Sequence, residues 1–427
     1  MPPTRRFLFL QGPHGPFFHR LGRRLRAAGC DVWRVGFNGG DRAFWPDGVG
    51  YLPYPDPLAA WPDACAALLD GHGITDLVLY GDTRPVHAQA IAAARARTIR
   101  VHVFEEGYLR PFWVTYERGG ANGHSPLMDR TIPQMRAALA GVDTAQAATP
   151  AHWGDMRHHI FYGALYHLCV LAGRGGYRAY RPHRGVTVGR EAGLHLRRLL
   201  CLPLAALDRH LATTRIVRGG FPYHLGLLQL EHDASFRAHS PYASMTEVLR
   251  VVIAGFAAGA PPHHHLILKA HPLEDGRAPL RATIRDLARD HQVHGRVHYV
   301  AGGKLARLMD EARSAITVNS TAAQQALWRG LPVKALGRSV FAKPELVSDQ
   351  SMADFFADPR PPERGAYRTY RQYLLRTSQV PGGFYSARGR QRLLRRIVDR
   401  MLSDVNPYDR IAAPRAEPRK NLKLASG

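Results

Sequence analysis

Four side chains able to do acid–base or nucleophilic chemistry stand where short apolar segments give way to polar residues. Glu105 and Glu106 follow RVHVF, Asp233 comes shortly after HLGLLQL, and His271 follows LILKA. If these segments are strands of open parallel sheets, their carboxyl ends are where ligands bind. One carboxylate could then act as nucleophile, another as general base, and the histidine as a donor to a departing phosphate. The pattern predicts a group-transfer site.

Each of these residues also has an ordinary structural explanation. A histidine at a strand end is often structural, and Glu105 and Glu106 could cap the strand or form an ion pair with Arg110. Consecutive histidines such as His263–His265 point to alternating faces of a strand, so they do not predict a metal site. We expect no metal and no cofactor.

A polar turn in the second half of the chain could hold a phosphate. Asn319, Ser320 and Thr321 stand between an apolar strand and an expected helix. The first N–H groups of a helix and the positive end of its dipole favour an anion. Ser320 and Thr321 are also common helix N-cap residues, and both roles can hold at once.

The segment KAHP adds to this turn. Pro272 keeps His271 in extended geometry at the end of a strand, and Lys269 two residues earlier could add positive charge. The chain has no GxxxxGK[ST] sequence, which excludes a P-loop nucleotide site. We interpret the second half as the nucleotide-binding half of a sugar-nucleotide enzyme.

Alternating strands and helices must position these residues. The expected strands in the first half are 6–10, 31–35, 74–80 and 100–104, and from residue 223 a second alternation contains HLGLLQL, HLILKA, RVHYVAG, SAITVN and PVKALG. This order is typical of parallel sheets with right-handed crossovers. We predict an α/β protein of GT-B type, with two Rossmann-like domains facing a cleft.

The expected domains follow from this alternation. They are an N-terminal Rossmann-like acceptor domain (1–130), a basic helical insertion (131–218), a C-terminal Rossmann-like nucleotide-sugar domain (219–345), C-terminal helices packing back on the N-terminal domain (346–405) and a flexible basic tail (406–427).

Charge and cysteine content limit the surroundings of the protein. The 427 residues include 58 Lys and Arg against 34 Asp and Glu, a formal charge of +24, which attracts nucleic acid or an anionic membrane surface. No RNP, zinc-finger or helix-turn-helix signature supports nucleic acid. The four cysteines show no CxxC spacing, which suits a reducing compartment, and no apolar run reaches 18 residues.

The stretch Arg174–Arg218 concentrates the positive charge, with ten arginines and two acidic residues. Two interpretations stay open for it. It is either an interfacial surface for anionic lipid headgroups or an ordinary solvated pair of basic helices.

The chain resembles one known family, the capsule polysaccharide β-Kdo transferases of the KpsS/LipB type. The segments that carry the resemblance run in the family's order across roughly residues 7–390: QGPHGPFF, GDTRPVH, EEGYLRP, NGHSPL, YRAYRPHR, LQLEHDASFRAHSPY, KAHPLEDG, VNSTAAQQALWRGLPVKALG and PGGFYS. Each segment alone is weak evidence, whereas the ordered set is specific.

The resemblance implies a GT-B-like fold and transfer of Kdo from CMP-β-Kdo to a (lyso)phosphatidylglycerol acceptor, starting the poly-Kdo linker of capsular polysaccharide. It implies net retention, with Asp233 as nucleophile and Glu105 or Glu106 as base. His271, Ser320 and Thr321 are expected to hold the CMP phosphate, with Lys269 nearby. The full set of expected nucleotide-binding residues is Lys269, His271, Pro272, Asn319, Ser320 and Thr321. For the acceptor we expect Gln11, Gly12, Asp82, Arg84 and Arg110, although Asp82 and Arg84 equally fit a structural role.

The expected location is the cytoplasm, peripherally on the inner face of the membrane, with capsule biosynthesis or export proteins as further partners. Two other functions remain open. The first is a linker-extending or sialyltransferase-like transferase that uses the same CMP-binding half. The second is a non-catalytic membrane component of capsule export.

Overall fold

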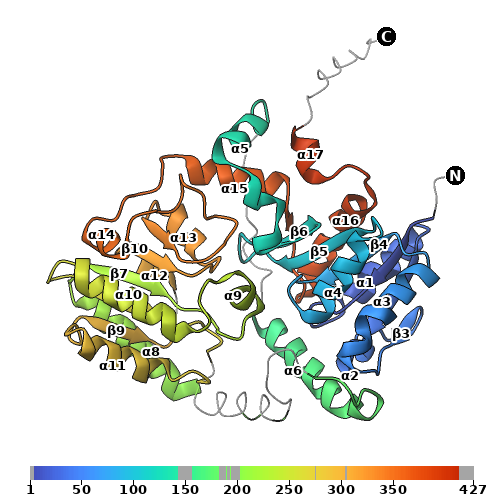
Figure 1. The fold of residues 1–427 in the computed structure, drawn as a ribbon, viewed down its shortest axis with the longest axis horizontal. Coiled ribbons are helices and arrows are strands. Elements are labelled where there is room, and N and C mark those ends of the chain that lie inside the picture. Colours follow the sequence, from blue (N-terminus) through green and yellow to red (C-terminus); the bar gives the residue numbers. More distant parts are fainter. Residues whose placement is uncertain are drawn as a thin grey trace, which may run out of the picture.

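The computed structural model describes residues 4–142, 156–181, 189, 193, 202–274, 276–302 and 305–412. It contains two α/β halves, each built around its own sheet, as the alternation of strands and helices predicts (Figure 1). Within the described residues, no helix is long and apolar enough to cross a membrane.

The first half contains a seven-stranded sheet. In spatial order its strands are β12 (Gln379–Pro381), β6 (Trp113–Arg118), β5 (Arg100–Glu106), β4 (Asp76–Tyr80), β1 (Arg6–Phe9), β2 (Asp31–Gly36) and β3 (Tyr51–Pro53). The strands from β5 to β3 are parallel, whereas β6 and β12 pair antiparallel. The four strands predicted here are confirmed, and β3, β6 and β12 were not predicted.

The second half contains a five-stranded sheet that is parallel throughout. Its strands in spatial order are β11 (Val333–Ala335), β10 (Ala312–Thr317), β7 (Tyr223–Leu227), β8 (His265–Lys269) and β9 (Val297–Val300). All five were predicted, because strands covered on both faces are nearly continuous apolar runs. The carboxyl ends of β7, β8 and β10 lead directly into the segments that contain Asp233, His271 and Ser320.

Helices cover both sheets. Their bounds are α1 (Phe17–Ala27), α2 (Gly39–Ala43), α3 (Trp61–Gly71), α4 (Pro85–Arg95), α5 (Ile132–Ala138), α6 (Met156–Ala172), α8 (Leu202–Arg218), α9 (Ala234–His239), α10 (Met245–Gly259), α11 (Leu280–Asp290), α12 (Leu305–Met309), α13 (Ala323–Trp328), α14 (Met352–Ala357), α15 (Ala366–Arg376), α16 (Ala387–Leu402) and α17 (Pro407–Ala412), with short 3₁₀ turns η1 (Leu58–Ala60), η2 (Asn122–His124), η3 (Pro126–Asp129) and η4 (Gly173–Gly176). Helix α10 illustrates the pattern: Ser244 caps its first turn, and Val248, Leu249 and Val252 are buried in one core with Leu266 and Leu268 of β8.

The stretch 131–218 does not form one helical unit in the described residues. Helix α6 packs against α2 of the first half, whereas α8 lies against β9 and α12 of the second half. Arg197 and Arg198, within the Arg-rich stretch, lie outside the described residues.

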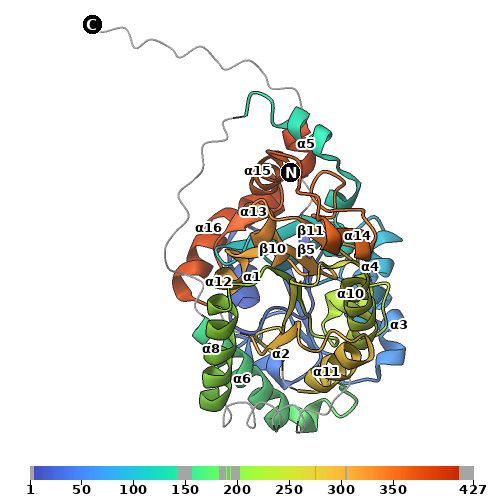
Figure 2. The same cartoon turned by 90° about the vertical axis from the view of Figure 1, so that its left-hand side faces the viewer.

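The chain after residue 345 is shared between the two halves. Helix α14 packs on α10 so closely that a Cβ at Gly259 would lie 2.0 Å from the carbonyl oxygen of Ala353. Helix α16 instead lies beside α1 of the first half (Figure 2). Strand β12 joins the first sheet, and Leu393 and Ile397 of α16 are buried in one core with Phe17. This division differs from the expected packing of all these helices on the N-terminal domain.

The expected flexible tail from residue 406 begins with an ordered helix. Tyr408 in α17 is 3% exposed, and its hydroxyl donates a hydrogen bond to the carboxylate of Glu117 in β6. A buried aromatic ring with a partnered hydroxyl fastens this part of the chain to the first half. Residues 413–427 lie outside the described part.

Candidate active site

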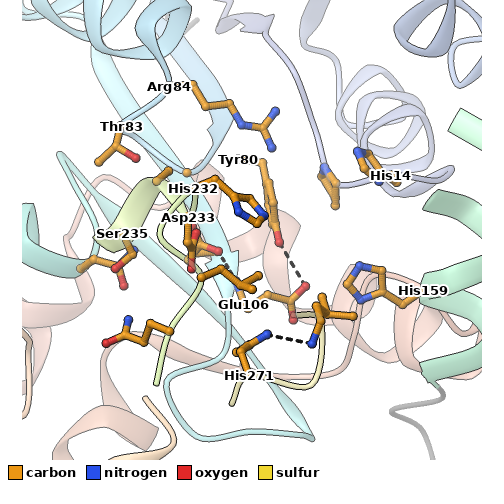
Figure 3. Close-up of a pocket in the computed structure, with 18 of the residues that line it drawn as sticks. His14, Tyr80, Thr83, Arg84, Glu106, His159, His232, Asp233, Ser235 and His271 are labelled. Carbon is orange, nitrogen blue, oxygen red and sulfur yellow. Dashed lines mark hydrogen bonds between the residues drawn. The ribbon is translucent and has the colours of Figure 1, made fainter. Parts of the chain in front are cut away.

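A cavity of about 360 Å³ lies between the two halves, at the carboxyl ends of both sheets. Tyr80, Arg84 and Glu106 enter it from the first half, and Asp233 and His271 from the second (Figure 3). Of the residues predicted from the sequence, those that line it are Gln11, Gly12, Arg84, Glu105, Glu106, Arg110, Asp233, His271, Asn319, Ser320 and Thr321. Strand ends far apart in the sequence thus converge on one cavity.

A second cavity of about 510 Å³ adjoins the first. Lys269 and Pro272 line this second cavity, and Arg110, His271, Ser320 and Thr321 line both. The predicted nucleotide residues therefore surround the junction of the two cavities, with Lys269 on the side away from Asp233.

The Glu105–Glu106 pair ends β5, and each carboxylate has different partners. Glu106 accepts hydrogen bonds from the hydroxyls of Tyr80 (3.1 Å) and Tyr385 (2.9 Å). Glu105 accepts from the backbone N–H of Glu106 at 3.0 Å. Arg110 donates instead to the carbonyl oxygen of Gly107 and forms no ion pair with either glutamate. The ion pair considered from the sequence is therefore absent from this described part of the chain.

Burial, with the negative charges of Glu106 and Asp233, raises the pKa of Glu105 to about 7, against the opposing effects of the Glu106 backbone N–H and the charge of Arg110. The glycine at position 81 leaves room for this carboxylate. Gly81 has a φ of +69°, and a Cβ there would lie 3.2 Å from Glu105 Oε2. Glu105 is thus a carboxyl group with a pKa near 7, and it lies close enough to Asp233 for the charge of Asp233 to contribute to that pKa.

Asp233 occupies the N-cap position of α9, but its carboxylate makes no capping hydrogen bond. The residue is exposed and lines the cavity. Its position is set by its neighbours: Phe236 is fully buried, and Asn319 Nδ2 donates to the carbonyl oxygen of Ser235 at 3.1 Å. Because the carboxylate of Asp233 makes no capping hydrogen bond and its turn is held in place, it is available to an incoming electrophile.

Asn319 and Gln229 form a buried pair behind Asp233. Gln229 Nε2 donates to Asn319 Oδ1 at 2.7 Å, and the backbone N–H of Asn319 donates to Gln229 Oε1 at 2.8 Å. Asn319 was predicted to bind the nucleotide. Its side-chain groups connect the end of β10 to the turn that carries Asp233, and its role in nucleotide binding stays a prediction.

His271 is oriented by its own turn. Its Nδ1 accepts a hydrogen bond from the backbone N–H of Leu273 at 3.0 Å, so the neutral ring carries its proton on Nε2. Lys269 is 5% exposed, and burial lowers the pKa of its ammonium group to about 8, with the charge of Arg209 contributing. His271 lines both cavities, whereas Lys269 lines only the second, where its ammonium donates to the carbonyl oxygen of Ala270 at 3.4 Å.

The phosphate turn differs from the sequence-based expectation. Helix α13 begins at Ala323 with Ala322 as its N-cap, so neither Ser320 nor Thr321 is the N-cap residue. The N–H groups of Ser320, Ala322 and Ala323 donate within the turn, to Thr317 Oγ1, Ser320 Oγ and the Ser320 carbonyl oxygen. The groups that this turn offers the cavity are therefore the hydroxyls of Ser320 and Thr321 rather than a row of amides.

Comparison with known proteins agrees with this arrangement of segments. A family model described as "Capsule polysaccharide biosynthesis protein" matches residues 75–385. The chain belongs to this family.

Two curated relatives align with most of this chain. It is 31% identical over 388 residues to LipB of Neisseria meningitidis serogroup A, described as a capsule polysaccharide modification protein, covering 89% of this chain and 91% of LipB. It is 29% identical over 387 residues to KpsS of Escherichia coli, a capsule polysaccharide export protein, covering 89% of this chain and 97% of KpsS.

A solved structure, the β-Kdo 2,7 transferase KpsC of Thermosulfurimonas dismutans, aligns with a TM-score of 0.40 at 12% identity, covering 87% of this chain and 90% of that one. A similarity at that level supports no conclusion about function.

Asp82 of this capsule-family protein lies away from the lining of the cavity. It is 3% exposed, and Oδ2 accepts from the backbone N–H of Ala121 (2.8 Å) and from His124 Nδ1 (3.2 Å). These contacts favour the structural one of the two roles that the sequence leaves open for Asp82, and its role in acceptor binding stays a prediction. They place it among the structural groups that hold η2 against the first sheet.

Asp82 also belongs to a group of possible metal ligands that the sequence did not predict. One ligand atom each of Asp82, His124 and His239 lies within 4.8 Å of the other two. Both ring nitrogens of buried His239, and Oδ1 of Asp82, lack a hydrogen-bond partner. The three residues could hold a divalent cation, but their spacing in the sequence gives no such signal.

Gly12 lines the cavity but also has a packing role. A Cβ at this position would lie 2.5 Å from the ring of Phe18, so only glycine fits against α1. Other residues of the cavity wall were not predicted as site residues: His14, Tyr80, His159, Tyr166, His167, Gln229, His232, Arg277 and Tyr385. PGGFYS, which contains Tyr385, is the one signal that could have indicated a residue from so late in the chain.

Proposed function

We propose that this protein is a retaining glycosyltransferase that moves β-Kdo from CMP-β-Kdo to a (lyso)phosphatidylglycerol acceptor. The observation that carries the proposal is that Asp233, whose carboxylate makes no capping hydrogen bond, lines the same cavity as Glu105 of the other half, whose pKa is about 7. Membership of the capsule polysaccharide family and the relation to LipB and KpsS support a role in making the carrier of capsular polysaccharide.

In the first step, the carboxylate of Asp233 attacks the anomeric carbon of Kdo. The bond from that carbon to the phosphate oxygen breaks, and CMP leaves with the electron pair. His271 Nε2–H donates a hydrogen bond to the departing phosphate, and the hydroxyls of Ser320 and Thr321 add further donors. The product is a glycosyl ester on Asp233 with inverted configuration.

In the second step, the acceptor hydroxyl attacks the same carbon and releases the Asp233 carboxylate. Glu105 takes the hydroxyl proton, since a carboxylate with a pKa near 7 is matched to general-base work at neutral pH. The second inversion restores the β configuration, so the transfer is retaining overall.

We assign the base to Glu105 and a positioning role to Glu106. The hydroxyls of Tyr80 and Tyr385 donate hydrogen bonds to one oxygen of Glu106 and hold its side chain in place. After burial, the negative charge of Glu106 contributes to the raised pKa of Glu105. Glu105 is therefore the member of the pair whose pKa lies near 7.

The acceptor enters from the side of the first half. Gln11, Gly12, Arg84 and Arg110 line that side of the cavity, and the two arginines can pair with the phosphate of a phosphatidylglycerol headgroup. The corresponding location is the cytoplasmic face of the inner membrane, beside other proteins of capsule synthesis and export.

Purified protein incubated with CMP-Kdo, generated in situ, and a fluorescent lyso-phosphatidylglycerol tests the proposal by mass spectrometry. A single Kdo addition is the expected result. Several additions would indicate a linker-extending enzyme, and faster turnover of CMP-sialic acid would indicate a sialyltransferase-like one. Failure of both donors would contradict the proposal and favour a non-catalytic component of export.

A further inference from the structure

Helix α6 is apolar on the side that faces solvent as well as on the side that packs. Tyr166 and Val170 are 7% and 5% exposed and lie against the first half, where a Cβ at Gly40 would touch the Tyr166 ring at 2.7 Å. On the opposite side Ile160, Phe161 and Leu168 are 60%, 59% and 62% exposed. A helix that is apolar all round is normally covered all round. Within the part of the chain that the structure describes, nothing covers the outer side of α6.

The charge around this outer side indicates what covers it. Residues 156–181 contain four arginines and no acidic residue. Arg157, Arg174, Arg178 and Arg181 are all exposed. Arginine next to exposed aromatic and aliphatic side chains is the composition of helices that lie in the headgroup region of anionic bilayers.

Helix α8 provides a second element of the same kind. Leu207 and Leu211 are 56% and 58% exposed on it, and its one acidic residue, Asp208, pairs with Arg281 at 2.8 Å. In both Figure 1 and Figure 2, α6 and α8 lie along the same end of the molecule. One plane can therefore meet both helices.

The inner side of α6 forms part of the wall of the active-site cavity, through His159, Tyr166 and His167. A helix with its side chains is about 10 Å across, so a surface covering the outer side lies roughly one helix diameter from the cavity. A headgroup anchored in that surface can reach the cavity while its acyl chain stays in the bilayer.

We propose that the outer side of α6, together with Leu207 and Leu211 of α8, docks on an anionic lipid bilayer and presents the lipid acceptor to the cavity. The presentation of an acceptor rests on the proposed function, whereas the docking does not. The alternative partner that could cover this apolar face is a second copy of this chain.

Vesicle sedimentation tests the docking without any turnover. The double variant Phe161→Ser/Leu168→Ser is compared with wild type on vesicles containing about 30 mol% phosphatidylglycerol and on phosphatidylcholine alone. The matched control, Val49→Ser/Val405→Ser, removes two valines that are 54% and 49% exposed on other elements. Because all four side chains are exposed, both variants should fold, which circular dichroism and thermal melting check.

The expected result is binding of wild type and control to the anionic vesicles, weakened by salt, and a loss of at least about tenfold in the α6 variant. Turnover of vesicle-embedded acceptor should fall in parallel, while turnover of a monomeric water-soluble acceptor stays the same. Equal binding of variant and wild type, or no binding by wild type, would overturn the proposal. A wild-type dimer that the α6 variant converts to monomer would show that a second copy covers this face. Normal vesicle binding without transfer would instead refute the proposed function alone.

Discussion

The hydroxyl of Tyr385 donates a hydrogen bond to Glu106 across 2.9 Å, although 279 positions separate the two residues in the chain. Tyr385 follows β12, which pairs antiparallel with β6 at the edge of the first sheet. The last part of the chain thus returns to complete the carboxylate pair formed near residue 105.

Replacing Tyr385 by Phe tests this connection. The change removes one charge-assisted hydrogen bond, worth about 1.5–3 kcal/mol, and leaves the ring packing in place. We expect a decrease in kcat of about tenfold or more with little change in the KM for CMP-Kdo. A steady-state comparison with Tyr242→Phe, a tyrosine remote from the glutamates, provides the control. Equal kcat values for the two variants would show that the hydroxyl of Tyr385 does not contribute to the reaction.

The pH dependence of kcat/KM should have two limbs. Glu105 must be ionised to act as base, so the rate should fall about tenfold per unit as pH drops below its pKa of about 7. Lys269 loses its charge above its pKa of about 8, so the KM for the anionic donor should rise there. The variant Glu105→Gln should lose the fall in rate below pH 7, together with most of the transfer to the acceptor. The variant Lys269→Met should lose the rise in KM above pH 8. An acid limb that survives in Glu105→Gln would point to Glu106 as the base.

The same glutamate should limit stability at alkaline pH. The folded protein holds the pKa of Glu105 at about 7 against an ordinary value of 4.5, so the ionised form is disfavoured in the fold. The penalty is absent below pH 4.5, grows as pH rises to 7 and stays constant above it. Glu105→Gln should therefore be more stable than wild type at pH 8, by about 1–3 kcal/mol, and nearly equal at pH 4. Chemical denaturation at both pH values measures this difference, and a destabilised variant at pH 8 would contradict the burial of this charge.

Asn319 should affect the chemical step rather than nucleotide binding. Asn319→Ala removes the hydrogen bonds to Gln229 and to the carbonyl oxygen of Ser235, which hold the turn that carries Asp233. We expect kcat to fall about 10- to 100-fold while the Kd for CMP changes less than about threefold. Calorimetric titration with CMP, together with kinetics, separates the two quantities. A large loss of CMP affinity with normal kcat would restore the role predicted from the sequence.

The strands were predictable because burial of both sheet faces leaves continuous apolar runs such as HLILK, and parallel order follows from the alternation with helices. The cavity followed from the same rule, since the strand ends carrying Glu105 and His271 face one edge of each sheet. The role of Asp82 stayed open in the sequence because its position after β4 does not show which way its side chain turns; in the structure it turns toward Ala121.

Residues brought in by long-range packing could not be predicted. Tyr385 reaches Glu106 only because β12 adds to the far edge of the sheet. Helix α6 has no amphipathic period, so its sequence does not show which side would line the cavity and which would face outward.

The proposed mechanism requires a covalent Kdo ester on Asp233, and trapping this intermediate tests the mechanism most directly. The variant Glu105→Gln lacks the base for the second step but keeps the nucleophile and the donor site. Incubated with CMP-Kdo and acceptor, it should accumulate one Kdo per chain, and peptide mass spectrometry should place that Kdo on Asp233. The adduct should be absent from Glu105→Gln/Asp233→Asn and undiminished in a control carrying Glu105→Gln with Asp286→Asn, an exposed aspartate on α11. A Kdo adduct on another residue, or full turnover by Asp233→Asn alone, would contradict the account.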